Sequence, residues 1–141
     1  MSKKMIYLLS ALSLCITLSL PANALAANNI DKQTIIESGG FLHTVFFWLK
    51  NPDNEGDRKA FEKHLNAFIN GSQYVKSKFI GTAAPSEREV VDSSYTYALV
   101  LSFSSQEDQK KYQTEQVHQK FVDDAKHLWK KVVVYDAFNS L

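Results

Sequence analysis

Two side chains in the C-terminal half of this 141-residue chain have the chemistry needed for proton transfer. His118 is a candidate general base, because an imidazole titrates near neutral pH and can take a proton from a carbon next to a carbonyl. Tyr112 is a candidate hydrogen-bond donor to an oxygen on which negative charge develops. A separation of six residues does not by itself place two side chains on one helical face. The alternative interpretation is therefore that both residues line a cleft or pack on a pair of helices.

The other three histidines are weaker candidates for chemistry. His43 lies in an apolar segment, where a hydrogen-bonded structural histidine is expected. His64 lies beside an apolar stripe and His127 precedes an apolar pair, so both are expected at the surface or rim. Histidines spaced as metal ligands and glycine-rich phosphate loops are both absent, so the sequence predicts neither a metal nor a cofactor.

The first 26 residues have the features of a cleavable export signal. Lys3 and Lys4 form a positive n-region, and residues 5–20 are almost wholly apolar or small. This run of about 16 residues is shorter than the roughly 20 that a membrane-spanning helix needs. A small-x-small triplet stands directly before Ala27, where cleavage is expected. We therefore expect a periplasmic or secreted protein with no membrane contact after cleavage.

Cleavage at this point would also change the chemistry of the chain. The only cysteine, Cys15, would leave with the signal, so no thiol would remain for disulfides, metal binding or nucleophilic catalysis. The formal net charge would fall from +1 to −1, because two lysines are removed. A chain without excess positive charge is not expected to bind nucleic acid.

The rest of the chain predicts a polar, flexible lead-in over residues 27–40 and one domain over residues 41–141. Strands are expected where β-branched and aromatic residues gather, at 41–49, 74–80, 95–103 and 131–138. Helices are expected where apolar residues recur at helical spacing, at 57–71, 104–114 and 116–128. Asp57 and Ser104 are the expected N-caps of the first two.

This element order, β-α-β-β-α-α-β, predicts an α+β domain in which helices cover one face of a four-stranded antiparallel sheet, a ferredoxin-like fold. The strands are apolar on both sides, and a second copy of the chain is the simplest cover for the other face. A homodimer with facing sheets is therefore expected. Large aromatic residues are expected mainly in the core, although a small barrel lined by them could hold an apolar ligand: Phe46, Trp48, Phe79, Phe103 and Trp129.

From residue 41 onward the sequence resembles the stress-responsive A/B barrel (Dabb) family. The resemblance is carried by four segments, Leu42-His43-Thr44-Val45-Phe46, the Tyr-Thr-x-Ala-Leu-Val-x-x-Phe strand from Tyr95, residues 112–121, and Val132-Val133-Val134-Tyr135-Asp136. Of the family pattern His-Pro-x-His-x-x-Phe, the chain keeps His118 and Phe121, while Glu115 and Gln116 replace the first two residues. The resemblance implies a dimeric α/β barrel made of two ferredoxin-like halves.

The resemblance also implies a site. A plant member of the family, olivetolic acid cyclase, is a polyketide cyclase that performs an intramolecular aldol condensation with a tyrosine and a histidine six residues apart. The match places Tyr112 and His118 on these catalytic positions. Its cleft also holds a first-strand histidine, matched by His43, and a third-strand histidine, which Tyr97 replaces. The ligand-binding residues expected in this chain are His43, Tyr97, Phe121 and Trp129.

Two main functions remain open at this point. The first is an exported, dimeric barrel that binds a small apolar or aromatic carbonyl compound, with cyclase-like or isomerase-like proton transfer by His118 and Tyr112 if it is an enzyme. The second is a non-enzymatic stress or envelope protein whose barrel serves dimerisation and stability. A monooxygenase is a third hypothesis, which rests on the general architecture alone.

Overall fold

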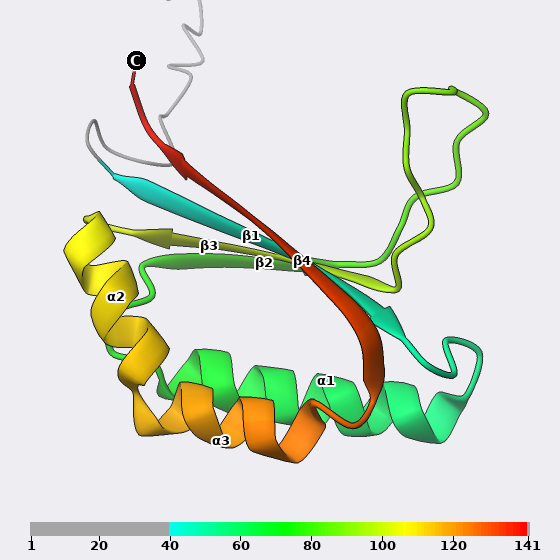
Figure 1. Cartoon of the computed structure of the whole chain (residues 1–141), viewed down its shortest axis with the longest axis horizontal. Helices are drawn as coiled ribbons and strands as arrows, with labels where there is room; N and C mark the ends of the chain where they lie inside the picture. Colours follow the sequence, from blue (N-terminus) through cyan, green and yellow to red (C-terminus); the bar gives the residue numbers. More distant parts are fainter. Residues whose placement is uncertain (1–39, 141) are drawn as a thin grey trace, which may run out of the picture. The chain divides into compact units, whose positions relative to one another are not determined.

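The computed structural model describes residues 40–140, which form a four-stranded sheet with three helices on one face (Figure 1). The elements are β1 (Phe41–Leu49), α1 (Glu55–Gly71), β2 (Ser77–Gly81), β3 (Tyr97–Phe103), α2 (Gln106–Thr114), α3 (Gln116–Ala125) and β4 (Trp129–Phe138). Every strand pairing is antiparallel, which confirms the predicted ferredoxin-like fold. The expected export signal over 1–26 and nearly all of the expected lead-in over 27–40 lie outside the described residues.

Strand β1 is central and separates two environments. The sheet order is β2-β3-β1-β4, so β1 pairs with β3 on one side and β4 on the other. Because successive side chains of a strand point to opposite faces, its odd-numbered residues lie beneath the helices and are buried, whereas its even-numbered residues lie on the outer face and are half-buried. The strand alternation therefore gives each face of the sheet its own set of side chains.

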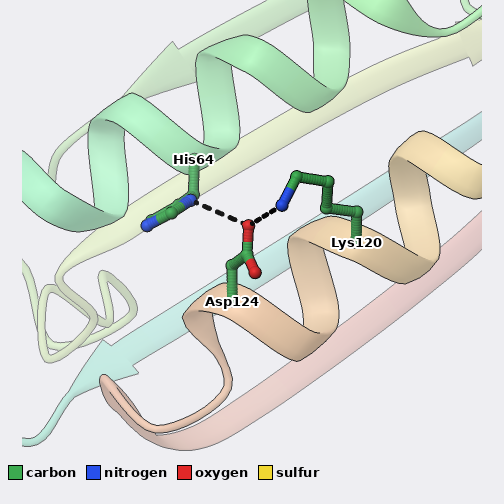
Figure 2. A network of polar contacts seen from close by, with 3 residues as sticks. All are labelled: His64, Lys120 and Asp124. Carbon is green, nitrogen blue, oxygen red and sulfur yellow. Dashed lines mark hydrogen bonds and ion pairs between the residues drawn. The ribbon is translucent and has the colours of Figure 1, made fainter.

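Helices α1 and α3 lie side by side and cover the inner face (Figure 1). The apolar stripe expected on α1 is buried, as are Phe121 and Ala125 of α3. A polar contact joins the two helices at their surface, as Figure 2 shows. Asp124 Oδ2 accepts a hydrogen bond from Lys120 Nζ at 2.7 Å and lies 3.4 Å from His64 Nδ1. His64 is thus a rim residue, and His127 is exposed, as both were expected to be.

Two helix caps differ from the sequence prediction. Asn54, not Asp57, caps α1, because its Oδ1 accepts the backbone N–H of Asp57 at 2.9 Å. Ser105, not Ser104, caps α2, because its Oγ accepts the backbone N–H of Asp108 at 3.2 Å. In both helices the residue whose N–H is capped is acidic, Asp57 in α1 and Asp108 in α2, and it lies in the first turn, where the helix dipole favours negative charge.

Several boundaries also differ. Strand β2 begins at Ser77 rather than at residue 74, α3 ends at Ala125 rather than at residue 128, and β4 begins at Trp129 rather than at residue 131. Phe103 is buried as expected, but the prediction of a core position for Phe79 is wrong, since its side chain is 61% exposed. Phe79 stands opposite Val100 on the outer face of an edge strand, where no helix covers it. Within residues 40–140, none of the helices has the length and hydropathy needed to cross a membrane.

Candidate functional site

A cavity of about 230 Å³ lies between the inner face of the sheet and helices α2 and α3. Its walls are mainly aliphatic and aromatic, and four polar side chains are exposed to it: His43, Tyr112, Gln113 and His118. Five of the six site residues expected from the sequence line it together: His43, Tyr112, His118, Phe121 and Trp129. The cavity is thus an apolar space with a small group of polar atoms, which is the usual composition of a small-molecule site.

Tyr112 and His118 meet because the chain breaks between α2 and α3. Helix α2 ends at Thr114, and Glu115 has extended backbone angles of φ −60° and ψ 140° before α3 begins at Gln116. This single extended residue redirects the chain, so the Tyr112 and His118 ring centroids lie 4.8 Å apart. A continuous helix would not bring residues six apart onto one face.

The side chain of Glu115 fixes this break to the end of α1. Its carboxylate accepts a hydrogen bond from Ser72 Oγ at 2.6 Å and another from the backbone N–H of Gln73 at 2.8 Å. Both donors belong to the segment directly after α1. From the sequence, Glu115 is only a departure from the family pattern, and this positioning role was not predicted. An acidic residue between two helical patterns was the available signal.

His118 is held in a defined tautomer. Its Nδ1 lies 3.1 Å from the carbonyl oxygen of Gln113, and because a carbonyl only accepts, Nδ1 carries the hydrogen. The neutral ring therefore has its lone pair on Nε2. Burial is the main cause that lowers the pKa of His118 below its usual 6.5, and nearby His43 lowers it further, against the opposing effects of the Gln113 carbonyl and Glu115. The imidazole is consequently unprotonated, and able to act as a base, at neutral pH.

Tyr112 has the opposite role, as a protonated donor. Its side chain is 1% exposed, and burial raises its pKa above the usual value of 10, with Glu115 and Asp136 adding to the rise. The phenol therefore keeps its proton at neutral pH. Among residues 40–140 its hydroxyl has no hydrogen-bond partner, so the proton is available to a ligand in the cavity.

A second imidazole enters the cavity from β1. His43 is 6% exposed, and its Nδ1 donates to the Asp136 carboxylate of β4 at 2.6 Å. The two residues are direct cross-strand partners in the register of the sheet. His43 is therefore both the hydrogen-bonded histidine that the sequence predicted and a cavity residue. Asp136 was missed as a site residue, although it is the one charged residue in the apolar run 132–138.

Tyr97 does not line this cavity. Its ring stacks on Phe61 of α1 with centroids 4.9 Å apart, and its hydroxyl donates to Glu62 Oε1 at 2.5 Å. Helix α1 supplies both contacts, so the Tyr97 side chain packs against α1. Over residues 40–140 no group of three or more histidine, cysteine, aspartate or glutamate side chains gathers in a way that could hold a metal ion.

Replacing Glu115 by alanine should destabilise the fold by about 1 to 3 kcal/mol, because two hydrogen bonds to a carboxylate are lost. The free energy of unfolding measured in urea gives this value. Gln116→Ala, at the adjacent exposed position, is the matched control and should change the stability by less than about 0.5 kcal/mol. Equal effects of the two substitutions would contradict the role assigned to Glu115.

The domain is similar to known proteins in sequence pattern and in structure. The model of the stress responsive A/B barrel domain matches residues 41–139. A Dabb family protein with a ferredoxin-like fold from Mesorhizobium loti is similar in structure, with 20% identity and a TM-score of 0.60 over 71% of this chain and 96% of that chain. A hydroxynitrile lyase from Passiflora edulis has 18% identity and a TM-score of 0.63 over 72% of this chain and 94% of that one.

A dimeric ferredoxin-like protein of unknown function from Thermobifida fusca has 14% identity and a TM-score of 0.58, over 73% of this chain and 93% of that chain. No curated protein sequence matches this one. At these identities the structural similarities show the fold, while the family model covers almost all of the described domain. The chain belongs to the stress responsive A/B barrel (Dabb) domain family.

Proposed function

We propose that this protein binds a small apolar or aromatic carbonyl compound in its inner cavity and moves a proton at the carbon next to the carbonyl. The observation that carries the proposal is the pairing of a neutral imidazole, His118, with a protonated phenol, Tyr112, on the wall of an apolar cavity. The volume of about 230 Å³ lies below the range of roughly 300–1,000 Å³ of sites for drug-sized ligands. A ligand with a single ring is therefore the appropriate size.

In the proposed reaction, His118 Nε2 takes the proton from the carbon next to the carbonyl. The electron pair of that C–H bond forms a C=C bond, and the π pair of the carbonyl moves to its oxygen. Tyr112 donates its hydrogen bond to this oxygen as negative charge develops on it. The enolate then either attacks a second carbonyl of the same molecule, whose oxygen takes the proton back from His118 in an aldol-type cyclisation, or takes that proton from His118 at another carbon, which is an isomerisation. The walls are mainly apolar, so the local dielectric constant is lower than that of water, which strengthens both polar interactions.

The remaining polar groups support this assignment of roles. The Asp136 carboxylate fixes the orientation of the His43 ring, whose centroid lies 5.8 Å from that of Tyr112. Both imidazoles thus pack against the Tyr112 ring, and His43 also lines the cavity, where it can contact the ligand. The hydroxynitrile lyase from Passiflora edulis is an enzyme with a similar fold, which makes catalysis in such a cavity reasonable.

The competing hypothesis is a non-enzymatic stress or envelope protein whose barrel serves only dimerisation and stability. Such a protein would need no open space on its inner face and no free donor there. The cavity and the unused Tyr112 hydroxyl therefore favour ligand binding over this hypothesis.

Acetophenone is a suitable probe, because it is a neutral aromatic ketone with protons next to the carbonyl. The protein should catalyse exchange of these protons for deuterium in D₂O, measured by NMR against buffer alone. His118→Gln should lower the rate by about 10² to 10⁴, the usual contribution of a general base. The wild-type rate should fall as the pH drops through the His118 pKa, below 6.5, because protonation removes the lone pair of the base.

His127→Gln is the matched control for this experiment, because His127 is exposed and outside the cavity, and it should exchange at the wild-type rate. Tyr112→Phe should slow exchange by about 10² to 10³, the cost of losing one oxyanion donor. Exchange no faster than in buffer, or equal rates for His118→Gln and His127→Gln, would favour the non-enzymatic hypothesis.

We further propose that a second copy of the chain covers the outer face of the sheet. Large apolar side chains are exposed on this face, among them Phe79 at 61% and Tyr135 at 64%. No helix covers them, and apolar patches of this kind mark interaction surfaces. The protein from Thermobifida fusca, which has a similar fold, is dimeric.

Phe79→Lys should therefore weaken dimerisation, because it places a charge in the expected interface. Sedimentation equilibrium should show a dimer for the wild type and an increased monomer fraction for the variant. Val90→Lys, at an 82% exposed loop position, is the control and should remain dimeric. A monomeric wild type would exclude this arrangement.

We also propose export to the periplasm or the medium, supported by the charged and apolar pattern of residues 1–26. Expression of the full chain in a Gram-negative host should yield an extracytoplasmic product whose mass and N-terminal sequence begin at Ala27. An intact product in the cytoplasm would contradict export, and Ala26→Arg should block cleavage because the site requires a small residue there.

A further inference from the structure

A groove of about 140 Å³ runs between helices α1 and α3 at the surface of the domain. It is lined by His64, Ala67 and Phe68 of α1 and by Val117, Lys120, Phe121 and Asp124 of α3. Residues three or four apart share one face of a helix. Asp124 reaches His64 across the groove, as Figure 2 shows. The groove is therefore the seam along which the two helices pack.

The groove and the inner cavity share two aromatic side chains. Phe68 and Phe121 line both spaces, and their rings stack with centroids 5.0 Å apart and an interplanar angle of 14°. Both side chains are buried, so the stacked pair is the partition between the two spaces. On the groove side of this partition the apolar lining consists of the smaller side chains Ala67 and Val117.

The stacked pair lies beside the two proposed catalytic side chains. The Phe68 ring centroid is 5.5 Å from that of Tyr112 and 5.3 Å from that of His118. The inner cavity opens instead at the edge strand β4, where the lining residues Val132 and Val134 are exposed. The cavity thus has an open side at β4 and a closed side at Phe68, and the closed side adjoins the groups that would hold a carbonyl.

We infer that the Phe68–Phe121 pair makes the site selective for methyl ketones, an inference that rests on the proposed carbonyl ligand. A ketone whose oxygen lies at Tyr112 and whose neighbouring carbon lies at His118 has two substituents. One of them can extend towards the open side at β4, whereas the other meets the stacked rings. The second substituent must be small, so a ketone with two large substituents fits in neither orientation.

The groove behind the pair provides a way to change this selectivity. Shortening Phe68 removes one of the two rings of the partition, so the inner cavity would continue into the groove beside Ala67. The space gained is limited, because a Cβ atom at Gly71 would lie only 3.0 Å from Val117 Cγ1, and the helices approach closely there. Each methylene group of a ligand that finds room in this space should improve its affinity about fourfold.

Acetophenone and butyrophenone are the probes, because the first has a methyl substituent and the second has two large substituents. Calorimetry measures the dissociation constant of each without any need for turnover. The wild type should bind acetophenone at least tenfold more tightly, although butyrophenone is the more apolar molecule. The ratio of the two dissociation constants should shift in favour of butyrophenone by at least fourfold in Phe68→Leu and at least tenfold in Phe68→Ala.

Phe61→Leu and Phe61→Ala are the matched controls, because Phe61 lies on the same helix, is fully buried and lines neither space. Their ratio should equal that of the wild type, and the leucine pair serves where an alanine variant does not fold. An unchanged ratio in Phe68→Leu, the same shift in Phe61→Leu, or equal binding of both ketones by the wild type would overturn the inference.

The binding measurement also separates this inference from the proposed reaction. Selective binding of acetophenone without deuterium exchange would remove the reaction and leave the selectivity of the Phe68–Phe121 pair in place. Exchange with an unchanged ratio in Phe68→Leu would remove the selectivity alone. A lack of saturable binding of either ketone would overturn both.

Discussion

The hydrogen bonds of the Glu115 carboxylate to the end of α1 are the constraint on which the candidate site depends. Without the extended residue at this point, α2 and α3 would continue as one helix and their polar side chains would diverge. Because the carboxylate is bound to Ser72 and Gln73, the direction of α3 is set relative to α1. The positions of Tyr112 and His118 thus depend on a residue that itself does not line the cavity.

The two imidazoles of the site are also held in place by hydrogen bonds to fixed partners. Each has its Nδ1 bound to a fixed acceptor, the Gln113 carbonyl for His118 and the Asp136 carboxylate for His43. The acceptors differ in charge and the rings differ in sequence position, yet in both cases the second nitrogen remains for other contacts. Orientation of a histidine by a partner at its other nitrogen is a common way to prepare it for chemistry. Here the backbone and the sheet register supply the two partners.

Sequence reasoning predicted the fold well because the signals were local. The continuous apolar strand 41–49 matched β1 residue for residue, and the α1 stripe from Phe61 to Ile69 was buried as predicted. The predicted N-cap positions were wrong by three residues for α1 and by one residue for α2. Neighbouring polar residues offer equivalent hydrogen-bond acceptors, and only the three-dimensional turn selects one of them. The core position predicted for Phe79 was wrong, because the alternation of side chains defines two faces of a strand but does not say which of them is left uncovered in an edge strand.

The candidate site was predictable only through resemblance, because its geometry depends on contacts distant in sequence. Tyr112 and His118 were expected together in a cleft by resemblance, and their rings lie 4.8 Å apart on the cavity wall, but the chain break that joins them was only a possibility in the sequence. Tyr97 was placed with them by position on the third strand, whereas the structure places it against α1, where Glu62 binds its hydroxyl. Asp136 and Glu115 act through partners 93 and 43 positions away, which no local pattern reveals.

Strand β1 supplies side chains to both faces of the sheet. Val45 and Phe47 line the inner cavity, whereas Phe46 and Trp48 lie on the outer face, so alternate residues of a single strand serve different faces. Insertion or deletion of one residue in β1 would exchange the two sets of side chains between the faces. A substitution on one face of β1 therefore leaves the side chains of the other face in place, whereas a change in the length of the strand would alter both faces at once.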